Sequence, residues 1–137
     1  MTPQQSILFE CDRRSREDVV RDCIATLNGH SFDDHFLRVI GGPSAETVLD
    51  DRAGGVRGYW PRVWAARGLL HVWDDVATAA VIDATTDDSW RVREMSAKVI
   101  ARHRVKPAID AVVALLDDHN ARVRAAAGRA FHAVVES

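Results

Sequence analysis

The first strong helical pattern along the chain lies between Ser15 and Asn28. Apolar residues recur there at the spacing of one helix face, at Val20, Cys23, Ile24 and Leu27. Ser15 stands three residues before Asp18, a typical N-terminal capping arrangement, and Asn28-Gly29 is a typical stop. The pattern predicts an amphipathic helix over 15–28.

Two shorter helices are predicted next. Ser31 can cap a helix over 32–40, in which Phe36 and Ile40 share a face and Gly41-Gly42 provides the end. A third helix is predicted over 44–51. No segment of the chain shows sustained alternation of period two, so the sequence predicts an all-α fold.

The second half of the chain repeats itself at an interval of 31 residues. At this shift three helical stretches align without a gap: Pro61 to Arg67, Val92 to Lys98, and Val123 to Arg129. Asp87, which precedes the second of them, aligns with Asp118. A constant period with two helices per unit is typical of an α-solenoid, here a short stack of antiparallel helical hairpins.

Apolar faces recur with the same period. In the last unit the first helix has Ile109, Val112, Val113 and Leu116 on one face, and the second helix has Val123, Ala126, Ala127, Ala130, Phe131 and Val134. Small residues on the second helices are expected to let neighbouring helices approach closely, at Ser96, Ala97, Ala127 and Gly128. This pattern accounts for much of a composition with 20 Ala and 17 Val.

The last unit has the pattern Ala108-Ile109-x-x-Val112-Val113-x-Leu115-Leu116-Asp117-Asp118-x-x-x-x-Val123-Arg124-x-x-Ala127. The middle unit carries the same turn, Asp87-Asp88-Ser89-Trp90-Arg91-Val92-Arg93. Both resemble HEAT repeats and are similar to the short variety found in phycobilin lyases and many bacterial scaffold proteins. The resemblance implies stacked hairpins but no single function, because one fold serves many partners.

The expected organisation is a single HEAT-like domain over 1–137. Clear repeats occupy 74–104 and 105–137. A degenerate repeat with a loop insertion is predicted over 43–73, where Val48-Leu49-Asp50-Asp51 imitates the turn of the last unit. Residues 1–42 show no repeat pattern and are expected to form a divergent helical region.

The insertion, Arg52 to Pro61, is the main candidate site. It holds three glycines, two arginines and two aromatic residues, and insertions in solenoids form loops that often carry function. Tyr59 and Trp60 are predicted to contact a protein partner, with Arg52 and Arg57 facing an acidic segment. In the alternative, Trp60 merely covers a neighbouring helix end. A phosphate loop is excluded because no Gly-Lys-Ser/Thr follows.

Two basic columns recur on the second helices, which are expected to line a concave surface. The first comprises Arg62, Arg93 and Arg124; the second comprises Arg67, Lys98 and Arg129. Either column can bind an acidic peptide or a phosphate backbone. Alternatively, the first pairs with turn aspartates (Asp87 or Asp88 with Arg93, and Asp118 with Arg124), and the second is an exposed, solvated face.

The four tryptophans divide into two kinds. Trp64 and Trp73 fit predicted core faces, whereas Trp60 and Trp90 lie at helix starts and are candidate surface residues. The mixture of Trp and Arg is similar to that of DNA-binding HEAT arrays of alkylated-base glycosylases. A net charge of −2, from 18 basic and 20 acidic residues, makes nucleic acid the alternative to a protein partner.

Other function classes find little support. No apolar run approaches the roughly 18 residues of a membrane span, and Met1 to Arg14 does not resemble a secretory signal. Cys11, expected on a loop, and Cys23, expected on a helix, favour a reduced, cytoplasmic protein. His30, Asp33, Asp34 and His35 can gather a metal, but capping is the preferred interpretation, so no metal, cofactor or enzymatic activity is predicted. The phycobilin-lyase resemblance implies a further alternative, action on a bound small molecule.

The end of the chain is expected to be a second interaction surface. Phe131, Val134 and Val135 lie on the last predicted helix, and solenoids normally need a polar terminal cap. If these side chains are exposed, they form an apolar patch that favours self-association or docking. The overall prediction is a non-catalytic protein-binding or scaffold module that uses its concave face and the 52–61 loop.

Overall fold

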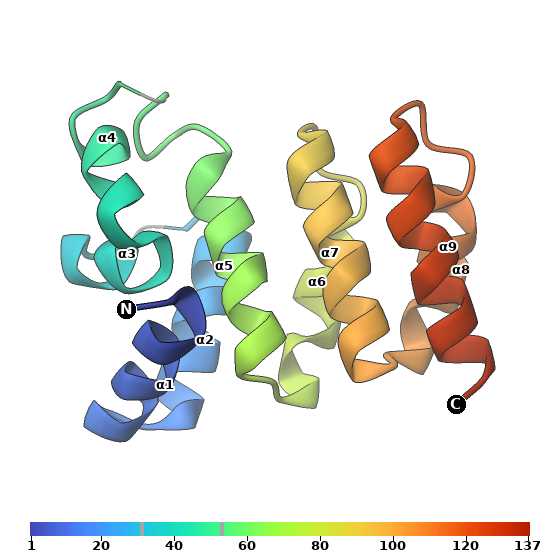
Figure 1. Ribbon diagram of the computed structural model, residues 1–137, viewed down its shortest axis with the longest axis horizontal. Coiled ribbons are helices and arrows are strands. Elements are labelled where there is room, and N and C mark those ends of the chain that lie inside the picture. The colour runs from blue at the N-terminus through green and yellow to red at the C-terminus, as the bar shows by residue number, and fades with distance from the viewer. Residues whose placement is uncertain (31, 53) are drawn as a thin grey trace. The chain divides into compact units, whose positions relative to one another are not determined.

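A computed structural model describes residues 1–30, 32–52 and 54–137, and these residues form helices and no strand (Figure 1). The all-α prediction is therefore confirmed. The chain divides into two compact units, Met1–Asp74 and Asp75–Ser137. The grouping of 1–137 into one HEAT-like domain stays a prediction.

The first unit contains helices of unequal length: α1 (Pro3–Arg13), α2 (Arg16–Leu27), α3 (Asp34–Gly41), α4 (Ala45–Leu49) and α5 (Trp60–His71), with a 3-10 turn at Gly42–Ser44. The helix predicted over 15–28 is α2, and the Ser15 hydroxyl accepts a hydrogen bond from the Asp18 N–H at 3.0 Å. At α3 the cap is Asp33, whose carboxylate accepts from the Phe36 N–H at 2.6 Å. Ser31, the predicted cap, lies outside the described residues.

Helix α1 was not among the predicted elements. Its start has the full set of local signals: the Thr2 hydroxyl accepts from the Gln5 N–H at 3.1 Å, and the Gln5 amide oxygen accepts from the Thr2 N–H at 2.8 Å. This reciprocal capping box, followed by Pro3 in the first turn, is readable from sequence. Cys11 consequently lies on a helix, and its expected position on a loop is wrong.

The core of the first unit forms where α1, α2 and α3 pack against α5. Its largest fully buried side chains include Ile7, Val19, Val20, Leu37, Val48 and Leu69. Gly41, at the end of α3, lies so close to the Trp64 ring that a Cβ there would come within 2.6 Å of Cε3. The buried Trp64 therefore depends on a residue without a side chain.

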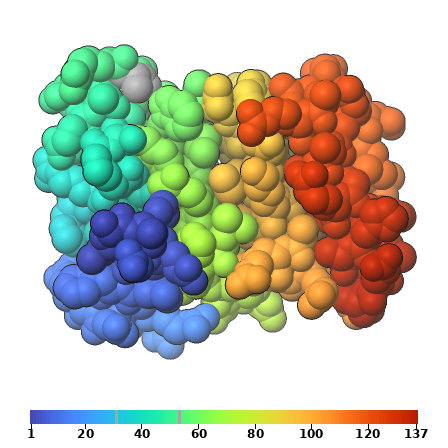
Figure 2. Space-filling model, in the orientation of Figure 1, coloured from blue at the N-terminus to red at the C-terminus, as the bar shows by residue number. Residues whose placement is uncertain are grey.

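The second unit consists of two antiparallel hairpins with equal spacing. The first has a 3-10 turn at Asp75–Ala77, α6 (Thr78–Ala84) and α7 (Trp90–His103); the second has a 3-10 turn at Lys106–Ala108, α8 (Ile109–Leu115) and α9 (Ala121–Val135). Each element of the second hairpin begins 31 residues after its counterpart. Helices α7 and α9 run side by side, and their surfaces touch in Figure 2.

The predicted face of α9 is largely confirmed, because Val123, Ala126, Ala127, Ala130 and Val134 are buried and Phe131 is half-buried. The predicted face of the preceding helix is confirmed only in part, because Val112 is buried and Leu116 packs against the core, whereas Val113 is not buried. Ala108 and Leu115 are also buried there, and Val113 is 47% exposed. A seven-residue helix that continues from a 3-10 turn buries one residue per turn, at spacings of four and three.

Candidate protein-binding surfaces

The loop between α4 and α5 is shaped by a glycine-rich turn. Gly54 and Gly55 have φ angles of 84° and 64°, in the left-handed region that glycine adopts without strain. At Gly55 an added Cβ would also collide with the Asp51 carboxylate. The Gly58 N–H then donates to the Gly55 carbonyl at 3.1 Å. The glycines are therefore required by the path of the loop, which leads directly into Tyr59 and Trp60.

The loop aromatics form a row that continues into the core. The ring centroids of Tyr59 and Trp60 are 5.1 Å apart, and Trp60 stacks on Trp64 at 6.1 Å with an interplanar angle of 25°. Tyr59 and Trp60 are half-buried, whereas Trp64 is buried. Such contacts fix ring orientation and leave part of each loop aromatic accessible to a partner.

A cavity of about 370 Å³ opens beside this loop. The described residues that line it come from the end of α2, the α2–α3 connection, the start of α3, the loop and the first turn of α5: Thr26, Gly29, His30, Phe32, Asp34, Val56, Arg57, Pro61 and Arg62. The exposed Arg57 guanidinium has no hydrogen bond or ion pair with another described residue. Arg52, which sequence reasoning grouped with Arg57, instead pairs with Asp50 at 3.2 Å between Nη2 and Oδ2.

On the second unit, Trp90 is surrounded by basic groups. The guanidinium carbons of Arg91 and Arg122 lie 4.5 and 5.1 Å from its ring centroid, within range of a cation–π interaction. Arg122 Nε is also 3.1 Å from Glu94 Oε2, and Lys98 Nζ is 3.9 Å from Glu94 Oε1. The half-buried Trp90 and Lys98 are thus already engaged within their own unit.

The first basic column has a structural role. Arg93 donates to the Asp118 carboxylate at 2.8 and 3.2 Å and to the Asp87 carbonyl at 2.8 Å. Hydrogen bonds from Arg93 lower the pKa of Asp118 below its ordinary value. Arg124 donates to the Asp118 carbonyl at 2.7 Å, and Arg62 to the Gly58 carbonyl at 3.2 Å. The predicted carboxylate pairing is corrected, because Arg93 bonds the aspartate of the next repeat rather than that of its own turn.

The second basic column does not form one uniform ladder. Arg67 is half-buried and donates through Nη2 to the Ile40 carbonyl at 2.7 Å, so its expected exposure is wrong. Burial lowers the pKa of Arg67. Lys98 is paired with Glu94, whereas Arg129 is exposed and has no ion-pair partner among the described residues. Equal sequence spacing has placed three cations in three different environments.

The profile of the HEAT repeats matches residues 59–132, more than half of the chain, from the row of loop aromatics to the last turn of α9. The chain belongs to the HEAT repeat family. HEAT repeats generally mediate protein–protein interaction. The narrower likeness to the phycobilin-lyase variety stays a prediction. A comparison with curated proteins gives no match.

The last helix of this HEAT-repeat protein carries the residues predicted for self-association. Val135 is 58% exposed and Phe131 is half-buried, but Val134 is buried in the core of its own unit and offers no surface. A Cβ at Gly128 would meet nothing within 4 Å, so the close helix approach expected there is wrong. Ala97, the equivalent residue of α7, is fully buried. Helix α9 therefore leaves uncovered a face that α7 buries.

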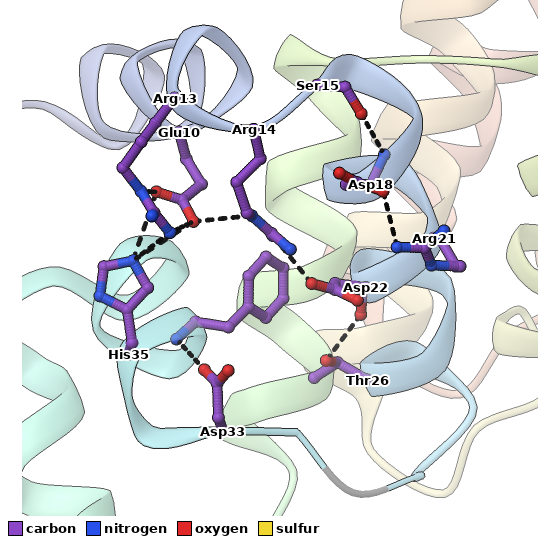
Figure 3. A network of polar contacts seen from close by, with 11 residues as sticks. Glu10, Arg13, Arg14, Ser15, Asp18, Arg21, Asp22, Thr26, Asp33 and His35 are labelled. Carbon is purple, nitrogen blue, oxygen red and sulfur yellow. Dashed lines mark hydrogen bonds and ion pairs between the residues drawn. The ribbon is translucent and has the colours of Figure 1, made fainter.

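A charged network in the first unit escaped the sequence prediction (Figure 3). The buried Glu10 carboxylate accepts from Arg13 at 2.9 and 2.8 Å, and Arg14 Nε lies 2.9 Å from it. His35 Nε2 is 3.2 Å away, and Arg14 Nη2 also pairs with Asp22 at 2.8 Å. The network thereby joins α1 to α2 and α3. Had α1 been recognised, the spacings of three and four between Glu10 and the arginines would have indicated it.

The network also determines a protonation state. Hydrogen bonds from Arg13 lower the pKa of Glu10 to about 2, and the nearby His35 acts in the same direction, against the opposing effect of burial. Glu10 is therefore ionised at neutral pH. Because the described partners of its carboxylate, Arg13, Arg14 and His35, all come from the same unit, we assign this network to stability.

The structure also bears on the predicted alternatives to protein binding. Within residues 1–30, 32–52 and 54–137, no three His, Cys, Asp or Glu side chains gather as a metal site would require. Among the candidates, Asp33 caps α3 and His35 contacts Glu10, which confirms the capping interpretation for Asp33. In the same parts of the chain, no helix combines the length and apolar character needed to cross a membrane.

Proposed function

We propose that this HEAT-repeat protein is a non-catalytic protein-binding module, a scaffold whose main binding surface is the 52–61 loop. The observation that carries the proposal is the row of Tyr59 and Trp60, anchored on Trp64, beside a cavity lined by Arg57, which has no partner among the described residues. Aromatic residues and arginine are enriched at the energetic centres of protein interfaces. Ring stacking also lowers the entropy lost when such side chains bind.

The second helices extend this proposal to the second unit. Trp90, Lys98 and Arg129 present aromatic and basic groups there, of which Arg129 is the most available because it is exposed and unpaired among the described residues. We assign these residues to a basic surface of the second unit for an acidic partner, and Arg52 to the periphery of the loop surface of the first unit. Arg67 contributes through packing, since its guanidinium bonds the Ile40 carbonyl. Free Cys11 and Cys23 fit action in the reducing cytoplasm.

Affinity capture from the cells that make the protein tests the main surface. The double variant Tyr59→Ala/Trp60→Ala should lose the partners that the wild type recovers. Phe9→Ala, which removes a 60% exposed aromatic side chain from α1, should retain them. Equal recovery by all three proteins, with helix content unchanged by circular dichroism, would contradict the proposal.

Salt dependence separates this proposal from the nucleic-acid alternative. Capture through aromatic contacts should change little between about 50 and 200 mM salt, whereas backbone binding through several arginines would weaken by orders of magnitude. A steep loss of binding over that range would favour nucleic acid.

We also propose a second copy as a partner of α9, through Phe131, Val135 and the exposed Val113. Light scattering should show a dimer for the wild type and a monomer for Val135→Asp, because a carboxylate in an apolar contact is strongly unfavourable. Ala133→Asp, a change on another face of the same helix, is the matched control. A wild type that is monomeric at all concentrations would refute this part of the proposal.

A further inference from the structure

Beside the loop, the geometry points to a specific ligand chemistry. We infer that the cavity lined by Arg57 binds an acidic segment of the partner protein, taking one Asp or Glu carboxylate and the apolar side chain next to it. This inference rests on the proposed function and narrows it to a class of partner sequence.

The size of the cavity suits a side chain. Its volume of about 370 Å³ is many times the roughly 30 Å³ that one liquid water molecule occupies. The walls come from segments that are distant in sequence, including Gly29 after α2, Asp34 at the start of α3, and Pro61 in α5. A hollow between several packed elements has a shape determined by the fold of the first unit rather than by one side chain.

The charges on the wall favour a carboxylate. Among the described residues that line the cavity, Arg57 and Arg62 carry guanidinium groups and Asp34 carries a carboxylate. Asp34 stands in the first turn of α3, where the helix dipole partly offsets its negative charge. Arg62 donates to the Gly58 carbonyl, whereas Arg57 has no partner among the described residues. The available group is thus a single guanidinium, which binds carboxylates through charge-assisted hydrogen bonds.

Apolar surface lies on the same wall. Val56 is 48% exposed and Phe32 is half-buried, and both line the cavity with the buried Pro61. Covering Val56 and Phe32 would remove apolar area from water and so add to the affinity. The preferred ligand is therefore a carboxylate beside an apolar side chain. The Asp34 carboxylate disfavours a phosphate, which at neutral pH carries more negative charge than the single Arg57 guanidinium offsets.

The end-capped peptide acetyl-Gly-Glu-Leu-Gly-amide is the probe, followed by NMR of the ¹⁵N-labelled full chain. We expect its addition to shift the Arg57 Nε–H signal and the Gly29 and His30 amide signals. A Gln replacement for Glu in the peptide should weaken binding at least about fivefold, as should a Ser replacement for Leu.

Arg57→Gln should weaken binding of this peptide by a similar factor. Arg21→Gln, which removes another exposed arginine of the first unit, one that pairs with Asp18, should leave it unchanged. Both positions are exposed, and an amide spectrum that is unchanged beyond the neighbours of each substitution will show that each variant is folded.

Several outcomes would overturn the inference. They are equal binding of the Glu and Gln peptides, equal weakening by Arg21→Gln and Arg57→Gln, tighter binding of inorganic phosphate at the same signals, or tighter binding of acetyl-Gly-Gln-Leu with a free C-terminal carboxylate. If the peptide does not bind but capture of partners still depends on Tyr59 and Trp60, only the assignment of a carboxylate ligand to the Arg57 cavity is wrong. If capture is also independent of those residues, the proposed function fails with it.

Discussion

The two units of the chain use different interactions to hold helices together. In Met1–Asp74, helices of unequal length meet around α5 and are joined by the buried Glu10 network and by the tight contact of Gly41 with Trp64. In Asp75–Ser137, two hairpins of equal spacing pack small apolar residues. There the Arg93–Asp118 ion pair joins one repeat to the next.

The difference shows what repetition provides. In the second unit the contact between the two helices of a hairpin recurs, so alanine and valine can fill it in both hairpins. The arginine at one position of the repeat also contacts the turn of the next hairpin. In the first unit the contacts between helices differ from one another, so each contact is stabilised by a different kind of interaction. A buried carboxylate is tolerated there because several cationic and hydrogen-bonding groups surround it. The same irregular unit also carries the loop and the cavity proposed to bind a partner.

The largest expected effect comes from breaking the network of the first unit. Glu10→Gln should lower the free energy of unfolding by about 3 kcal/mol at pH 7, because it leaves Arg13 and Arg14 without their shared carboxylate. Glu46→Gln, which breaks the Arg38–Glu46 pair of 2.7 Å, should cost less than about 1 kcal/mol because both side chains are half exposed. Urea denaturation measures both changes, and equal costs would contradict the assigned role.

The same network predicts a pH dependence. The pKa of Glu10 is lowered from 4.5 to about 2 in the folded protein, so its stabilising contribution is complete above pH 4.5 and disappears as the pH falls towards 2. The difference in unfolding free energy between wild type and Glu10→Gln should therefore shrink across this interval. A difference that stays constant down to pH 2 would show that the ionised carboxylate is not responsible.

The next largest effect separates tight from open packing. Gly41→Ala should destabilise the protein by about 2 kcal/mol, because the new methyl group overlaps the buried Trp64 ring. Gly128→Ala on the last helix should instead stabilise it by about 0.5–1 kcal/mol, since alanine favours helix and nothing lies within 4 Å. Thermal denaturation compares the two. A change of the same sign in both variants would contradict the packing described here.

The smallest expected effect tests the contact between repeats. Asp118→Asn should cost about 1 kcal/mol, because a neutral amide accepts weaker hydrogen bonds from Arg93 than the carboxylate does. Asp117→Asn, one residue earlier and exposed, should cost almost nothing. Amide hydrogen exchange within Asp75–Ser137 should accelerate for the first variant only. Equal amide exchange rates in the two variants would contradict the role of Asp118 in joining one repeat to the next.

Local sequence signals predicted the elements that repeat or carry caps. The shift that aligns Asp87 with Asp118 reproduced the spacing of the hairpins, and Ser15 marked the start of α2. The loop aromatics Tyr59 and Trp60 were also found, because an insertion interrupts a regular period. Helix α1 was missed although Thr2 and Gln5 carried a readable signal.

The candidate site was predicted only in part. Arg52 and Arg57 look equivalent in sequence, yet one is paired with Asp50 and the other lines a cavity without a partner among the described residues. Likewise Arg67 and Arg129 share one column of the repeat but differ in burial. Spacing places a residue on an element, whereas its partners come from segments that are distant along the chain.

The sequence by itself determined the all-helical fold, the period of 31 residues and the position of the loop, because helix faces, caps and insertions are local patterns. Tertiary structure decided which charges are buried, that Gly41 must lack a side chain, and where the cavity opens. Those properties depend on which helices meet. Contacts such as Ile40 with Arg67, or His35 with Glu10, join residues that no local pattern relates.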